Sequence, residues 1–290
     1  MRHRQTITIL TILLLLLTIL SSVFGILAYQ NTSGAQFTSL YGEHIQLFGN
    51  GIYARDSVSV AVQGIASDIV TLFVMVPATI FALLSMLRKS LKGTLILTGL
   101  LGYFLYTYTS YTFLWMYNPL FLVYVAQMSL SLFTFVLLLM SFDRNRLRNA
   151  ILPSFPKWTL IVFMSVLSTL VGLMWLARIV PALIEGVAPV GLEHYTTLVI
   201  QALDLGFVIP ATLVAVMLLV QDHIWGYYLA SILIFKYVAL LMAISAMVVL
   251  MAIENTGASM LEGSIFITFT VLALAMLALL FRGIRSTHLS

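Results

Sequence analysis

The sequence predicts an all-α integral membrane protein, folded as a bundle of eight transmembrane helices. Of its 290 residues, 61% are hydrophobic and only 8% are charged, whereas a soluble domain carries about a quarter charged residues. The mean hydropathy is +1.08, so the chain has too few polar residues to cover a surface that faces water. This composition excludes a soluble enzyme, a nucleic-acid-binding protein and a disordered chain. Because there is no cysteine, disulfides, thiolate metal sites and iron–sulfur clusters are excluded as well.

Eight stretches are long and apolar enough to cross a bilayer, because a spanning helix needs about 20 apolar residues for about 30 Å of hydrocarbon. They lie at about 7–29, 65–87, 93–116, 119–142, 158–181, 198–220, 225–252 and 263–281. A basic segment, Met1–Arg4, precedes the first of these stretches. The apolar core of a signal peptide is preceded by a basic segment in the same way. Since this run is longer than a usual signal-peptide core, we expect a retained helix. Cleavage would leave seven spans with the N-terminus outside.

The basic residues predict that both termini are cytoplasmic and that the protein lies in a plasma membrane, the inner membrane if the source is bacterial. With the N-terminus inside, eleven of the fourteen Lys and Arg residues fall on the cytoplasmic side, as the positive-inside rule requires. The formal charge of +4 therefore reflects topology and indicates no nucleic-acid partner. A loop at about 30–64 is left outside. Its Gly49-Asn50-Gly51 segment, flanked by apolar residues, predicts a small hairpin or an ordered cap.

A weak internal repeat is visible within the single transmembrane domain that covers residues 1–290. Pro77-Ala-Thr-Ile80 matches Pro210-Ala-Thr-Leu213 at an offset of 133 residues. Four spans in each unit, 1–150 and 151–290, would give two copies with the same orientation, as in transporters built from parallel repeats. Chance identity between two apolar helices is the alternative interpretation. Each proline also predicts a kink, because it removes one backbone hydrogen bond.

Four ionisable side chains within or near the spans are the candidate functional groups: Asp68, Arg178, Asp204 and Lys236. Each charge near the centre of a bilayer costs about 2.5–3.5 kcal/mol on the insertion scale, so its presence indicates a function. Asp204 lies roughly 9 Å below the outer surface, at about the depth of Asp68 and Arg178, whereas Lys236 is near mid-membrane, about 15 Å away along the axis. The depths therefore favour pairing of Arg178 with Asp204 or Asp68. These groups either fix helix register as a buried ion pair or line a polar cavity open to the outside.

Two tyrosines of the third span are predicted to form the walls of that cavity. Tyr103 and Tyr106 share a helical face with Ser110, since steps of three and four residues stay together on a helix. A tyrosine buried at this depth needs a hydrogen-bond partner, so the face is expected to point into the bundle. Alternatively, the two tyrosines pack inside the bundle and bind no ligand.

The outer loops hold acidic and imidazole side chains that could act in catalysis: Glu43, His44, Asp56, Glu185, Glu193, His194, Glu254 and Glu262. A membrane-embedded enzyme acting on a lipid or lipid-linked substrate at the outer leaflet would bring those at positions 43, 44, 193 and 194 together near Asp68 and Asp204. The chain has no H-E-x-x-H spacing, nucleophile elbow, phosphate loop or haem-ligating histidine pair. The sequence therefore predicts no catalytic residue, metal or cofactor.

The function favoured by the sequence is transport or binding of a small polar solute or ion through an outward-facing cavity in the bundle. Asp68, Arg178, Asp204, Lys236 and the two tyrosines would line this cavity, and the other expected partners are membrane lipids. Two further classes stay open, the outer-leaflet enzyme and a non-catalytic subunit or sensor. An assembling subunit is disfavoured, because Gly99 and Gly102 are only three residues apart and no G-x-x-x-G face is formed.

Overall fold

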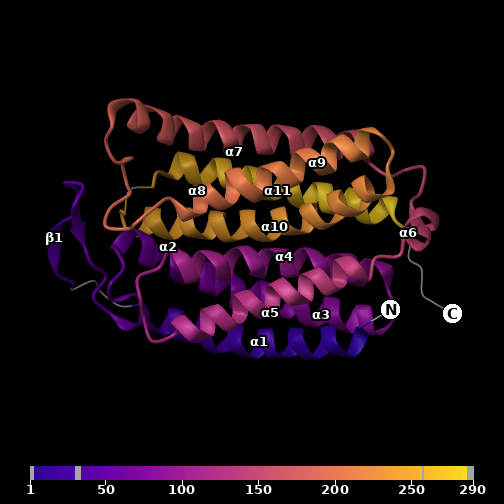
Figure 1. Cartoon of the computed structure of the whole chain (residues 1–290), viewed down its shortest axis with the longest axis horizontal. Helices are drawn as coiled ribbons and strands as arrows, with labels where there is room; N and C mark the ends of the chain where they lie inside the picture. Colours follow the sequence, from indigo (N-terminus) through magenta and orange to yellow (C-terminus); the bar gives the residue numbers. More distant parts are fainter. Residues whose placement is uncertain (1–2, 30–33, 257, 286–290) are drawn as a thin grey trace.

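The computed structural model describes residues 3–29, 34–256 and 258–285 as an elongated bundle of helices that run along its long axis (Figure 1). Seven helical segments of the described chain are long and apolar enough to cross a membrane. They are α1 (Arg4–Leu27), α2–η2–α3 (Val58–Leu87), α5 (Phe121–Met140), α7 (Lys157–Glu185), α8–η3–α9 (Val199–Val220), α10 (Ile224–Ile253) and the part of α11 (Met260–Gly283) from Gly263 onward. The chain is thus a multi-pass, all-α membrane protein.

Helix α4 (Leu91–Phe113) is not one of these seven, although the sequence predicts a span there. Its outer half is rich in tyrosine and threonine, which lowers its hydropathy. In the fold it is a helix of 23 residues, and it packs on α3, α5 and α10 in the middle of the bundle (Figure 1). The polar side chains are tolerated because protein, not lipid, surrounds most of them.

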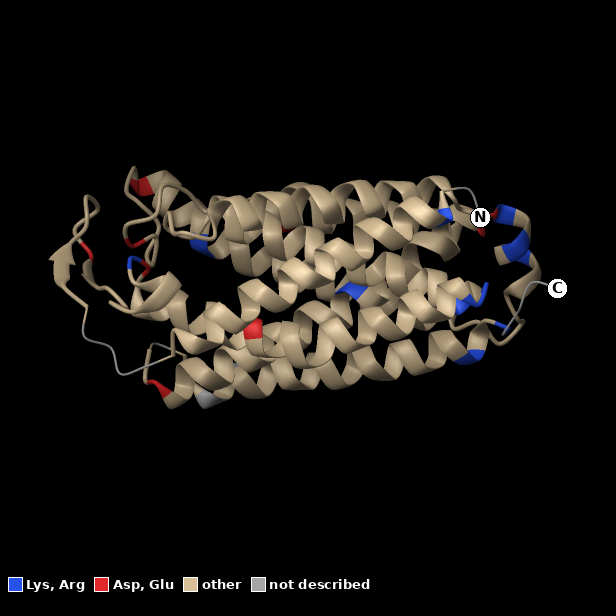
Figure 2. Cartoon of the chain, turned by 90° about the horizontal axis from the view of Figure 1, so that it is seen from below, with Lys and Arg blue, Asp and Glu red and all other residues tan. Residues whose placement is uncertain are grey.

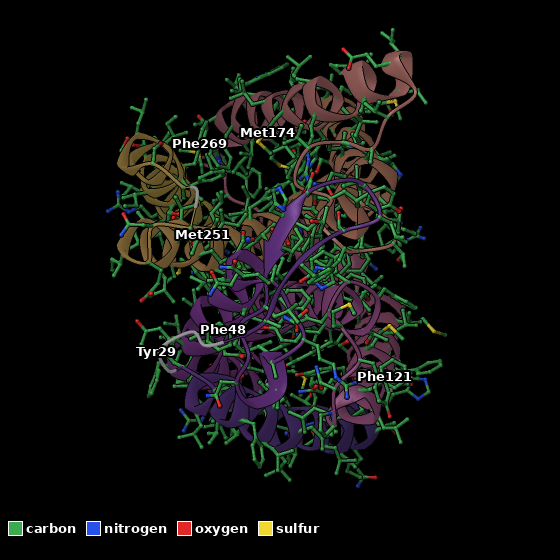
Figure 3. All side chains as sticks on the ribbon, turned by 90° about the vertical axis from the view of Figure 1, so that its left-hand side faces the viewer. Tyr29, Phe48, Phe121, Met174, Met251 and Phe269 are labelled. Carbon is green, nitrogen blue, oxygen red and sulfur yellow. The ribbon has the colours of Figure 1, made fainter. Side chains whose placement is uncertain are left out.

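The helices form two groups of four that meet where α10 packs on α2 and α4. The first group contains α1, α2–α3, α4 and α5, and the second contains α7, α8–α9, α10 and α11 (Figure 1). Each group has its own cluster of buried apolar side chains. Seen from one end, Tyr29, Phe48 and Phe121 lie over the first group, and Met174, Met251 and Phe269 lie over the second (Figure 3). The interface between the groups is the place where chemistry from both can meet.

One helix in each group is interrupted by a π-helical turn. The turn η2 (Thr71–Met75) separates α2 (Val58–Val70) from α3 (Val76–Leu87), and η3 (Asp204–Val208) separates α8 (Val199–Leu203) from α9 (Ile209–Val220). Each turn is followed by a proline at the second residue of the next helix, Pro77 or Pro210. A proline cannot donate to the carbonyl four residues earlier, so the helix widens there. A π-helical turn thus stands just before each of the two prolines at which the sequence predicts a kink.

The two ends of the bundle differ in structure and in charge. At one end, called here the hairpin end, β1 (Gln36–Thr38) pairs antiparallel with β2 (His44–Gln46), and η1 (Gly51–Tyr53) follows. At the other end, the basic end, lies α6 (Arg144–Ala150), and most Lys and Arg residues gather there (Figure 2). Helix α1 begins and α11 ends at this basic end (Figure 1).

The loop at the hairpin end corrects two details of the sequence interpretation. The hairpin turn lies between Thr38 and His44, where Gly42 has φ +84°, whereas the Gly49–Gly51 segment leads into η1. Helix α2 begins at Val58, where Ser57 accepts a hydrogen bond from the Val60 amide. The connecting loop is therefore shorter than predicted, because a serine cap starts the helix before the apolar run begins.

Candidate functional site

Asp204 connects three helices near the hairpin end. It is the first residue of η3, and only 6% of its surface is exposed. Its Oδ1 accepts a hydrogen bond of 3.0 Å from the Tyr106 hydroxyl of α4, and its Oδ2 accepts one of 2.8 Å from the Trp175 indole Nε1 of α7. Both oxygens thus hold a donor from a different helix, which fixes the orientation of the carboxylate.

Lys236 of α10 faces the same tyrosine. It is 5% exposed, and its Nζ has no hydrogen-bond partner among the described residues. The ammonium lies 4.3 Å from the centre of the Tyr106 ring and 5.7 Å from that of Tyr237, and Asp204 acts on it electrostatically. We call Asp204, Tyr106, Trp175, Lys236 and Tyr237 the Asp204–Lys236 site.

The sequence predicted an axial gap between Asp204 and Lys236 that a direct ion pair could bridge only if the lysine extended outward. Among the described residues the two form no direct salt bridge, although both contact Tyr106. In the fold, the flexible lysine stem brings the ammonium to the face of Tyr106, while the hydroxyl of the same ring bonds Asp204. The two charges therefore belong to one site.

Asp68 lies in a separate polar centre of the first group. The hydroxyl of Tyr53 donates to its Oδ2 at 2.5 Å, and the hydroxyl of Tyr111 donates to its Oδ1 at 3.2 Å. On α1, Gly25 leaves room for it, since a Cβ there would be 1.7 Å from Oδ2. Hydroxyl donors of the described residues stabilise this carboxylate, and they connect η1, α2 and α4.

Tyr103 and Tyr106 point to different groups of helices. The hydroxyl of Tyr103, which is fully buried, lies 2.7 Å from Thr71 Oγ1 in η2, whereas Tyr106 bonds Asp204 in η3. Their common helical face does point into the bundle, as predicted. Because α4 belongs to the first group and packs on α10 of the second, that face serves two sites instead of one cavity.

The predicted pairing of Arg178 with Asp204 or Asp68 is wrong. Its Nε donates to the carbonyl of Val190 at 3.1 Å, and its charge interacts with Glu43 and Glu193. Helix α7 continues to Glu185, so the guanidinium reaches the loops at the hairpin end. Within the described residues, the one direct salt bridge is Lys157–Asp222 at the basic end, at 2.6 Å.

Arg178 belongs to a cluster of acidic groups that joins the loops at the hairpin end. Glu43 accepts from the backbone amides of Gly191, at 2.8 Å, and Glu193, at 2.9 Å. Its two oxygens therefore serve to clamp the α7–α8 loop to the β-hairpin. His194 joins the cluster through a 3.1 Å contact between its Nε2 and the Arg55 carbonyl, but His44 bonds Thr38 on the hairpin.

Asp56 is the deepest carboxylate of these loops. It is fully buried, and its Oδ1 accepts from the Met116 amide at 2.9 Å and from the Tyr195 hydroxyl at 3.1 Å, while Oδ2 has no described partner. Burial raises the pKa of Asp56 to about 7 and also raises the pKa of Glu193. The cluster thus joins loops from both groups of helices. In the described chain, no three Asp, Glu or His side chains are placed to hold a metal ion.

The stability of these loops is expected to fall as the pH rises from about 4 to about 7. The pKa of Asp56 is raised from 3.8 to about 7 in the folded protein, so the folded state holds a proton that the unfolded chain releases. This stabilisation is fully present below the unfolded pKa and is lost as the pH passes the folded one. Melting temperatures in detergent between pH 5 and 8 should decrease with pH, and Asp56→Asn should flatten the profile.

The control for this prediction is Asp143→Asn, at an exposed cap of α6 on the basic end. Asparagine is an equally good helix cap, so the slope should be that of the wild type. A profile that is equally steep in the Asp56→Asn variant would contradict the assignment.

Two members of the Asp204–Lys236 site, Trp175 and Tyr237, were missed by the sequence interpretation. An indole N–H inside a span needs an acceptor, as a tyrosine hydroxyl does, so Trp175 could have been identified by the same reasoning that selected the tyrosines. Compared with protein families, curated proteins and solved structures, the chain matches none.

Proposed function

We propose that this protein binds a small polar solute or ion at the Asp204–Lys236 site and carries it into or across the membrane, reaching the site from the hairpin end. The observation that supports this most is the ammonium of Lys236, which is buried in the bundle without a hydrogen-bond partner in the described chain. Asp204 and Lys236 are only 6% and 5% exposed, so this conformation is closed and binding requires an opening.

A purely structural ion pair does not account for these contacts. A buried pair compensates for its lost hydration only if the two charges are in direct contact and their remaining hydrogen bonds are satisfied. Here Asp204 accepts from Tyr106 and Trp175 instead. The Lys236 ammonium lies over two tyrosine rings and has no hydrogen-bond partner among the described residues. A ligand that accepts hydrogen bonds would supply the partner that this ammonium lacks in the described part of the chain.

The proposed topology has eight spans, with both termini cytoplasmic in a plasma membrane. Helix α4 is the eighth span. The chain begins α1 and ends α11 at the same end of the bundle (Figure 1), which requires an even number of crossings, and α4 supplies the one that the seven apolar helices lack. The gathering of basic residues at this end (Figure 2) supports a cytoplasmic location under the positive-inside rule.

The two groups of helices are proposed to be parallel repeats. At the offset of 133 residues, η2 (Thr71–Met75) coincides with η3 (Asp204–Val208), and the end of α3 at Leu87 with the end of α9 at Val220. The start of α4 at Leu91 likewise coincides with that of α10 at Ile224. Residues Lys89 and Asp222, in the turns between, both have positive φ, 61° and 54°.

One contact between the groups joins equivalent positions of the proposed repeats. A Cβ on Gly99 of α4 would lie 2.8 Å from the carbonyl oxygen of Ile232 of α10, and Ile232 is the residue that corresponds to Gly99 at the same offset. A residue that touches its own equivalent marks a two-fold axis, here between α4 and α10. Transporters with parallel repeats bind their solutes near the interface of the repeats, which is where the Asp204–Lys236 site lies.

The opening of the site is proposed to occur at a π-helical turn. π-helical turns inside α-helices occur often at functional sites. Asp204 is the first residue of η3, so a change at this turn would move its carboxylate relative to Tyr106 and Lys236. We propose that bending at η3 opens the site toward the hairpin end.

Accessibility of Tyr106→Cys to a thiol reagent that does not cross membranes tests the proposed function. The chain has no cysteine, so a single one can be labelled without background. In intact cells we expect labelling of Tyr106→Cys and of the positive control Leu40→Cys, at a loop residue that is 99% exposed. The negative control Leu97→Cys, at a core position that is fully buried, should be protected. Protection of Tyr106→Cys in folded, inserted protein would overturn the proposal.

A further inference from the structure

We propose that the solute is a small carboxylate anion, which binds between Lys236 and Asp204 together with one proton on Asp204. This inference rests on the proposed function and adds the chemical class of the solute. No covalent step is involved: the anion and a proton enter from the hairpin end, and the proton adds to a carboxylate oxygen of Asp204.

The ammonium of Lys236 determines the charge of the ligand. An ammonium has three N–H donors and no acceptor, and none of the three has a partner in the described chain. The faces of Tyr106 and Tyr237, at 4.3 and 5.7 Å, offset only part of the cost of burying the charge. A negatively charged oxygen supplies what is missing, since charge-assisted hydrogen bonds are the strongest that an ammonium makes.

Asp204 is the group that takes up the proton when the anion binds. It faces Tyr106 of α4, Trp175 of α7, and Lys236 and Tyr237 of α10, and of these four only Lys236 carries a charge. With an ammonium and a carboxylate, the site has no net charge. An added anion would leave it negative in a region of low dielectric, which is costly. A proton on Asp204 restores neutrality and also turns the carboxylate into a donor.

Two donors beside one ring favour a carboxylate over a monatomic anion. The Lys236 ammonium lies over the face of the Tyr106 ring, and Asp204, the second donor once it is protonated, lies at the hydroxyl of that ring. A carboxylate has two oxygens and can accept from both, whereas chloride offers a single centre.

The first group of helices provides an internal control for this inference. At the offset of 133 residues, Thr71 and Tyr103 correspond to Asp204 and Lys236, and their hydroxyls form one hydrogen bond of 2.7 Å. The same helix pair and π turn are therefore stable with two uncharged side chains. The charges in the second group are not required by the fold, which favours a role in binding.

Acetate is the probe for the test, and two readouts report its binding. The chain has four tryptophans, and replacing Trp115, Trp158 and Trp225 by phenylalanine leaves Trp175 as a fluorophore bonded to Asp204. Sodium acetate should change the fluorescence of the detergent-purified protein saturably, whereas sodium chloride should not. In weakly buffered solution the protein should take up one proton for each acetate bound. Because binding takes up a proton, the apparent affinity for acetate should fall as the pH rises.

Three variants separate a binding role from a structural one. Lys236→Met should weaken acetate binding at least about a hundredfold, because the anion loses its charged partner. The double variant Asp204→Thr/Lys236→Tyr copies the pair of the first group, so it should fold like the wild type and bind no acetate. Asp204→Asn should bind acetate without proton uptake and with little dependence on pH.

The possible failures are distinguishable. If Tyr106→Cys is labelled from outside but acetate produces no saturable signal, or chloride saturates the site equally well, the carboxylate assignment is wrong and the proposed function stands. Acetate binding without proton uptake in the wild type would overturn the role of Asp204. If Tyr106→Cys is protected, the proposed function fails first.

Discussion

The Asp204→Asn variant should be less stable than the wild type by about 3 kcal/mol, because removing one member of a buried charge pair leaves the other charge uncompensated. Asparagine can still accept from Tyr106 or Trp175, so the loss arises mainly at Lys236, whose ammonium has no hydrogen-bond partner in the described chain. The free energy of unfolding, measured at pH 7 in mixed micelles with increasing SDS, provides the comparison.

The double variant Asp204→Asn/Lys236→Met is the control for this prediction. It removes both charges and should recover most of the lost stability. The coupling energy between the two sites should be about 2 kcal/mol, well above the few tenths expected for independent positions. Single effects that simply add would show that Asp204 and Lys236 do not act on each other.

The Gly99→Ala variant should weaken the contact between the two groups of helices by about 2–3 kcal/mol, the upper part of the range for overpacking. A Cβ on Gly99 would lie 2.3 Å from the Cβ of Phe235 and 2.8 Å from the backbone oxygen of Ile232. Neither atom belongs to the flexible end of a side chain, so α4 and α10 must separate to make room. The same unfolding assay measures the loss.

Gly102→Ala is the matched control on the same helix. Its new Cβ would meet Phe135 at 3.5 Å and Lys236 at 3.9 Å, which are ordinary van der Waals distances. We expect a change of no more than about 0.5 kcal/mol, as for substitutions that disturb no packing. Equal losses in the two variants would contradict the close approach of α4 and α10 at Gly99.

Hydrophobic length and loop charge predicted most of the fold. The helices begin and end within a few residues of the predicted spans, except where a capping residue such as Ser57 starts α2 early. The ends of a helix can be predicted locally, because they depend on the length of a single apolar run. Helix α4 shows the limit of this signal, because its tyrosines lower the hydropathy of a segment that the fold buries.

The candidate site was predicted less well, because its contacts join distant segments. Asp204 and Lys236 could be selected from the cost of burying charge. That both contact Tyr106 could not be predicted, because this depends on how α4 packs on the second group of helices. The partner of Arg178 was predicted wrongly, because its long side chain donates to the Val190 carbonyl in a loop and not to a buried carboxylate. For Asp68, the tyrosine partners come from η1 and α4, and no sequence spacing connects them.

The measurement that tests the central claim most directly compares Lys236→Cys with Tyr103→Cys. The two positions correspond at the offset of 133 residues, and both native side chains are buried, so they differ mainly in which group of helices they occupy. With an impermeant thiol reagent on intact cells, Lys236→Cys should be labelled, and Tyr103→Cys, beside Thr71 in the first group, should be protected. Protection of both, in protein shown to be folded and inserted, would contradict a solute pathway to the Asp204–Lys236 site.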